Sequence, residues 1–147
     1  MLNIYKNKLI LYIISIMPDK SSINKAFNSL IFSFLDDIIS IFPEQRDIAT
    51  AKTSLLSFKQ MNPSILIKSW HKLVYTPYAQ VIEAGDVNFF FEKDYSNDLQ
   101  NIPNGKEFMK VIDNVRAPIR TMDDKNKGHC ADYILKLSKL SAMYNTM

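Results

Sequence analysis

The sequence holds one cysteine and three glycines among its 147 residues. A single cysteine excludes an internal disulfide framework and a zinc site built from cysteine pairs. Three glycines leave no glycine-rich loop of the kind that cradles phosphate groups. The excess of one charge sign is also small, because 18 Lys and Arg residues against 15 Asp and Glu residues give a net charge of only +3. We therefore expect no bound cofactor and no metal, and the sequence names no enzymatic activity.

Strand patterns are missing as well, because no segment alternates polar and apolar residues for long enough. Helical spacing is present throughout and is clearest from Ile23 to Ile41, where apolar residues recur every three or four positions. With 47% hydrophobic residues the chain can form a real core. We predict an all-α fold, a single compact bundle of about six helices.

The starts and stops of the other helices are marked by capping residues and prolines. Ser21 or Ser22 is expected to cap the first helix, and Asp47 the second. Two prolines are expected at helix starts, in the pairs Asn62-Pro63 and Thr76-Pro77, while Pro118 should end the helix before it. Gly85 is expected in the left-handed conformation, followed by a short turn capped by Asp86; Asp123 or Asp124 should begin the last helix. Residues 93–105 are the longest predicted loop, and Trp70 is expected to be a buried anchor of the core.

The first sixteen residues stand apart. Leu9 to Met17 is an apolar run interrupted only by Ser15 and preceded by Lys6 and Lys8. The run is shorter than the roughly 20 residues of a membrane-spanning helix, and no small-residue cleavage pattern follows it. We predict that 1–16 is an apolar N-terminal extension, either an extra core helix or a segment upstream of the true start at Met17. Residues 17–147 then form one helical domain, and no membrane contact is expected unless residues 9–17 are native.

Candidate catalytic groups are few. His129 and Cys130 are neighbours on one helix and diverge by about 100°, so they do not form a catalytic pair. Asp36 and Asp37 diverge for the same reason, and one of them could pair with a cation on another helix. An enzyme would need a concave polar pocket that contains Asp36, His71 or His129. We predict that catalytic residues are absent and that Cys130 is a small core residue.

The aromatic stretch from residue 75 to residue 95 is the strongest functional signal. Three successive phenylalanines on a helix cover about 200°, so one buried face does not take all of them easily. Either they wedge between helices or one is exposed as an anchor, and Glu92 lies beside them as part of a charged rim. The predicted protein interface consists of Tyr75, Tyr78, Phe89, Phe90, Phe91 and Tyr95.

An alternative is a basic patch that contacts nucleic acid. It would consist of Arg116, Arg120, Lys136 and Lys139. Acidic residues are interleaved with these cations, and residues 76–147 carry 9 basic and 10 acidic groups, a net charge of −1. A nucleic-acid groove usually shows a clearer basic excess, so this reading is the second choice.

Several segments resemble short helical proteins, of unassigned activity, from nucleocytoplasmic large DNA viruses (mimivirus-like and alga-infecting lineages). The resemblance covers roughly residues 17–147, and its segments are residues 35–43, 51–53, 61–63, 74–78, 85–95 and 137–141, together with Trp70. It implies a viral protein that acts in the virion or in the cytoplasm of the infected host cell. The expected function is non-enzymatic and runs through contacts with a viral or host protein, with a second copy of the chain as a further candidate. The alternative is a nucleic-acid-associated role in genome packaging or transcription.

Overall fold

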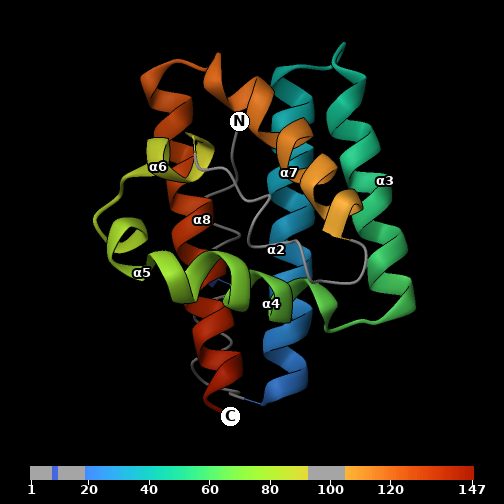
Figure 1. The fold of residues 1–147 in the computed structure, drawn as a ribbon, viewed down its shortest axis with the longest axis vertical. Helices are drawn as coiled ribbons and strands as arrows, with labels where there is room; N and C mark the ends of the chain where they lie inside the picture. Colours follow the sequence, from blue (N-terminus) through green and yellow to red (C-terminus); the bar gives the residue numbers. More distant parts are fainter. Residues whose placement is uncertain (1–7, 10–18, 93–104) are drawn as a thin grey trace.

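The computed structural model describes residues 8–9, 19–92 and 105–147 (Figure 1). No strand occurs within these ranges, which confirms the all-α prediction. The elements are α2 (Lys20–Ile41), α3 (Arg46–Met61), α4 (Ile65–Trp70), a π-helical turn η1 (His71–Tyr75), α5 (Thr76–Glu83), α6 (Val87–Glu92), α7 (Gly105–Arg120) and α8 (Asp124–Asn145). Because α4, η1 and α5 follow one another without a gap, the described part has five long helical stretches and the short α6, close to the predicted number. Most of the predicted extension 1–16 and of the predicted loop 93–105 lies outside the described residues, and Gly105 begins α7 instead of closing the loop.

Helices α2 and α8 form the centre of the bundle and pack along each other (Figure 1). Helix α3 lies beside α2, and α7 packs mainly on α3. The continuous stretch α4–η1–α5 crosses α8, with α4 also contacting α2. The central core consists of buried side chains at helical spacing, including Ile23, Phe27, Leu30 and Phe34 of α2 and Ile134, Leu137 and Leu140 of α8. The apolar stripes that the sequence predicts therefore face each other.

The caps agree with the prediction at the last helix and differ at the first two. The Asp123 carboxylate accepts from the Asn126 N–H at 2.8 Å and caps α8 as expected. At α2 the cap is Asp19, whose carboxylate accepts from the Ser22 N–H at 2.7 Å and from its hydroxyl at 2.9 Å, so Ser22 is a donor to the cap. The N-cap of α3 is Gln45, which places Asp47 inside the first turn, where its charge favours the helix dipole.

One of the prolines lies inside a helix, contrary to the prediction, and another lies at a helix start, as predicted. Helix α7 continues through the buried Pro118 for two further residues and ends at Arg120. Pro77 lies in the first turn of α5, and the helix is kinked at the next residue, Tyr78, whose φ of −129° is not helical. At Pro63 the helix starts two residues later, at Ile65, and Asn62 accepts from the Ser64 N–H at 3.1 Å.

The π turn η1 lies directly before the Thr76-Pro77 pair. In η1 the Thr76 N–H reaches the His71 carbonyl, which is five residues back. The turn therefore accommodates one extra residue ahead of the kink at Tyr78.

Polar side chains connect the central helices at two buried or half-buried points. The Trp70 indole N–H donates to the Ser138 hydroxyl at 2.9 Å, and the ring meets Phe27 edge-on with 6.1 Å between centroids. The Tyr133 hydroxyl donates to the Asp37 carboxylate. Trp70 is thus partly buried, less so than predicted, and it joins α4 to both α2 and α8.

The described helices also bear on the membrane question. None of them is long and apolar enough to cross a membrane. Of the apolar run 9–17, only Leu9 belongs to the described residues, and its side chain is exposed.

Replacing Trp70 by alanine should destabilise the fold strongly. The change removes the ring that contacts Phe27 and leaves the buried Ser138 hydroxyl without its donor, so we expect a loss of about 3–5 kcal/mol in the free energy of unfolding. Urea denaturation followed by circular dichroism measures it. The control is Leu56→Ala on the exposed face of α3, which should change stability by less than about 0.5 kcal/mol. Equal stability of the two variants would contradict the anchoring role of Trp70.

Candidate functional site

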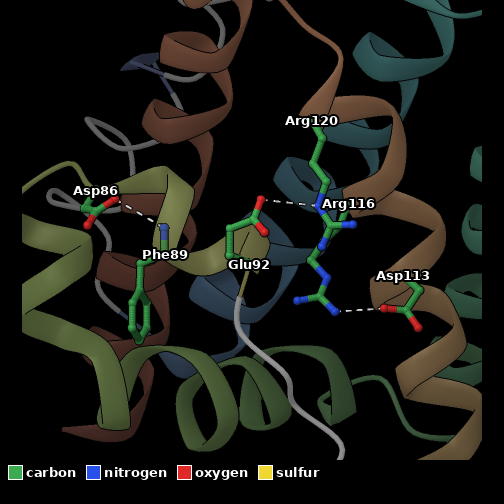
Figure 2. A network of polar contacts seen from close by, with 6 residues as sticks. All are labelled: Asp86, Phe89, Glu92, Asp113, Arg116 and Arg120. Carbon is green, nitrogen blue, oxygen red and sulfur yellow. Dashed lines mark hydrogen bonds and ion pairs between the residues drawn. The ribbon is translucent and has the colours of Figure 1, made fainter.

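The structure brings two of the predicted interface aromatics together. The rings of Tyr78 and Phe89 lie 5.0 Å apart between centroids, at an interplanar angle of 55°. Gly85 makes this contact possible, because its φ of +79° reverses the chain between α5 and α6. The Asp86 carboxylate then accepts from the Phe89 N–H at 3.2 Å, which caps the short helix as the sequence predicts (Figure 2).

Of the remaining predicted aromatics, Tyr75 is the one whose side chain the structure describes, and its ring contact is with another residue. Tyr75 lies against His71, with 5.8 Å between ring centroids, and its hydroxyl donates to Glu83 at 3.3 Å. Partial burial and the neighbouring Glu83 carboxylate raise the pKa of the Tyr75 hydroxyl. The side chains of Phe90 and Phe91 and the whole of Tyr95 lie outside what the structure describes. The predicted interface is therefore seen as two separate ring pairs.

The four cations of the predicted basic patch have different surroundings. The Arg116 guanidinium is buried and lies 2.8 Å from Asp113, and the buried Lys136 ammonium lies 2.7 Å from Asp132. Each ion pair joins two residues of the same helix: the pair in α7 has three-residue spacing, and the pair in α8 has four-residue spacing. The exposed Lys139 side chain is on α8 as well. Arg116 and Lys136 thus serve the packing of their own helices and do not offer an open row of charge to a phosphate backbone.

The fourth cation connects the two predicted sites. Arg120 of α7 lies 3.6 Å from the Glu92 carboxylate of α6 (Figure 2). Glu92 was expected in the charged rim of the aromatic segment, so the rim residue and the basic-patch residue face each other. Both side chains are substantially exposed, and such a pair contributes less than about 1 kcal/mol.

The structure places the candidate catalytic groups apart. Cys130 is buried, and its sulfur lies 3.6 Å from the Met122 sulfur. A thioether is not a base that could activate the thiol. His71 is on η1, beside Thr76. Asp36 is engaged by Lys52 of α3 at 2.6 Å, the interhelical ion pair that the sequence allows. Within the described residues no group of three or more His, Cys, Asp or Glu side chains could hold a metal ion.

An apolar groove opens between α4–η1 and α7, with α2 as its floor. Its volume is about 100 Å³, and every lining side chain but one is apolar. The lining residues are Ile31, Phe34, Leu35, Leu55, Leu66, Ser69, Trp70, Leu73, Val74, Phe108, Val111, Ile112 and Val115. The groove exists because α7 packs on α3 and makes no contact with α4 among the described elements. No spacing in the sequence reveals it, since each lining residue reads as ordinary core.

No protein-family model, no curated protein and no solved structure matches this chain.

The burial of Cys130 predicts how the stability of the fold changes at alkaline pH. Burial first, and the Asp37 charge second, raise the pKa of this thiol from 9.0 to about 12. A thiol whose pKa is raised by folding stabilises the fold fully below the unfolded pKa, and this contribution is lost as pH rises towards the folded value. Between pH 9 and pH 12 the wild-type free energy of unfolding should fall faster than that of Cys130→Ala, by up to about 1.4 kcal/mol per pH unit. Parallel pH profiles of the two proteins would contradict the assignment.

Proposed function

We propose that this chain is a non-enzymatic protein that acts through protein–protein contacts, and that its apolar groove receives one large aliphatic side chain from an amphipathic helix of the partner. The observation that carries the proposal is the groove itself: a hollow lined almost wholly by apolar side chains, beside the half-buried Trp70, Ile112 and Val115. Concentrated burial of one anchor in such a pocket is how protein interfaces obtain most of their binding energy.

The volume of the groove is large enough for one side chain of the partner and no more. A cavity of about 150 Å³ lined by aliphatic and aromatic side chains holds a benzene molecule. The groove, at about 100 Å³, therefore has room for a side chain of the size of leucine. A helix that lies across α4 and α7 could present such a residue, with further apolar residues three or four positions away.

The rigidity of the groove supports the same proposal. Trp70 on one wall is fixed by its hydrogen bond to Ser138. On the opposite wall Phe108 is stacked on Phe58 with 4.5 Å between ring centroids and 10° between planes. Walls that are already in place reduce the entropy cost of binding.

The partner class follows from the resemblance to proteins of large DNA viruses. Proteins of the viral particle or of its assembly, and host proteins in the infected cytoplasm, are the first partners to test. The nucleic-acid alternative receives less support, because Arg116 and Lys136 are buried and paired within their own helices.

A photo-crosslinking amino acid at Ile112 identifies the occupant. The matched control carries the same amino acid at Ala117, which is exposed on α7. We expect position 112 to crosslink one protein that position 117 does not, through an amphipathic helix. A crosslink to another segment of the same chain would show that the chain covers its own groove, and a crosslink to a second copy would show self-association. Either result would overturn the proposed hetero-partner.

Filling the groove should abolish binding of that partner without harming the fold. Ser69 lines the groove and is half-buried, so Ser69→Leu places an aliphatic side chain where the anchor would sit. Loss of a hot-spot contact of 2 kcal/mol or more predicts a rise in Kd of at least about 30-fold. Ser57→Leu, at an exposed position of α3, should leave the Kd unchanged. Calorimetry with the crosslinked partner measures both, and an unchanged Kd for Ser69→Leu would contradict the proposal.

A further inference from the structure

A second pocket, lined by side chains that can donate hydrogen bonds, lies on the other side of the helix that forms one wall of the groove. It is hollowed between η1 and the C-terminal end of α8, with a volume of about 320 Å³. The side chains that line it are Lys68, His71, Lys72, Thr76, Tyr144 and Asn145. We propose that this pocket binds the phosphate group of a small phosphorylated molecule.

The hydrogen-bond donors of the six lining side chains are the main support for this proposal. Each of the six side chains can donate a hydrogen bond, two of them are ammonium groups, and none is a carboxylate. An anion with several acceptor oxygens satisfies such a set, whereas a metal cation or an ammonium ligand does not. A phosphomonoester fits these donors, because it carries a charge of about −1.5 to −2 near neutral pH and three strong acceptor oxygens.

The π turn builds the pocket. In a regular α-helix, residues five positions apart point to different sides of the axis. The i→i+5 bond of η1 brings Thr76 above His71 instead, so that the Thr76 hydroxyl lies 3.4 Å from His71 Nδ1. When the hydroxyl donates to Nδ1, the neutral imidazole carries its proton on Nε2 and becomes a donor itself. Single π turns within helices are found frequently at functional sites.

A third ammonium group contacts one of the lining side chains. Lys20, at the start of α2, lies over the Tyr144 ring, 4.6 Å from its centroid. Tyr144 therefore has a lysine against its ring in addition to the two lysines that line the pocket. The net charge of the whole chain is only +3, so this concentration of positive charge is local and is not a general property of the surface.

Two acidic side chains of the adjoining segments accept hydrogen bonds within the chain. Asp19, next to Lys20 in the chain, caps α2 through Ser22. Glu83 accepts from the Tyr75 hydroxyl. A further negative influence is the C-terminal turn of α8, whose carbonyls carry a partial negative charge. Lysines that served only to balance that helix end would not hold an anion, and the experiment separates the two roles.

The size of the pocket indicates the ligand class. A water occupies about 30 Å³ of liquid volume, so 320 Å³ is far more than a phosphate ion alone requires. The remaining space suits a small organic group attached to the phosphate. The ligand class is therefore a phosphomonoester, and free phosphate is its weaker analogue.

Titrations of the full ¹⁵N-labelled chain with inorganic phosphate and, separately, with ribose 5-phosphate test the inference at constant ionic strength and about pH 7.5, where the second ionisation of a phosphomonoester is nearly complete. We expect saturable amide shifts confined to residues 68–76 and 144–145, with tighter binding of ribose 5-phosphate. Potassium chloride at matched ionic strength should give no saturable shift. Shifts that are linear, or that spread over all lysines, would mean general ionic screening and would overturn the site. Saturation by phosphate with no gain from the ester would restrict the ligand to free phosphate and overturn the ester assignment.

Variants assign the shifts to the pocket. Lys68→Gln combined with Lys72→Gln should raise the Kd for ribose 5-phosphate at least about tenfold, the loss expected when charge-assisted hydrogen bonds are removed. Both lysines are exposed, so the thermal midpoint should stay close to that of the wild type. Lys125→Gln with Lys139→Gln, two exposed lysines of α8 outside the pocket, removes the same charge and should change the Kd less than about twofold. Equal losses in the two double variants would contradict a defined site.

Discussion

The crossing of α4–η1–α5 over the central pair of helices is the constraint on which both proposed sites depend. One hydrogen bond, from the Trp70 indole to the Ser138 hydroxyl, joins this crossing to α8 in the interior, and the buried Leu66, Ile67, Leu73 and Val74 supply its apolar packing. Buried polar groups that find a partner favour one arrangement of the packed helices, because separating Trp70 from Ser138 leaves the hydroxyl without this donor. The crossing helix therefore has a defined rotation about its own axis.

That rotation gives the helix two different faces. Ser69, Trp70 and Leu73 face the apolar groove, whereas Lys68, His71 and Lys72 face the second pocket. The π turn brings Thr76 to the same side as His71 and so adds it to the second pocket.

The sequence predicts the helices better than it predicts the sites. The face from Ile23 to Ile38, the turn at Gly85 and the cap at Asp123 are local properties of spacing and side-chain chemistry, and the structure confirms them. The π turn at residues 71–75 has no comparable local signal in the sequence. Both the groove and the pocket arise between helices that are distant in sequence. The sequence marks His71 only as one of three residues that the pocket of an enzyme would contain, and the structure places it in the wall of the second pocket.

A double-mutant cycle between Trp70→Phe and Ser138→Ala tests the central claim most directly. The free energy of unfolding of the two single variants and the double variant is measured by urea denaturation. If the indole–hydroxyl bond fixes the crossing, the two losses are not additive, and the coupling energy is about 0.5–3 kcal/mol. If the losses add within about 0.3 kcal/mol, the bond does not couple α4 to α8, and the account of the crossing is wrong.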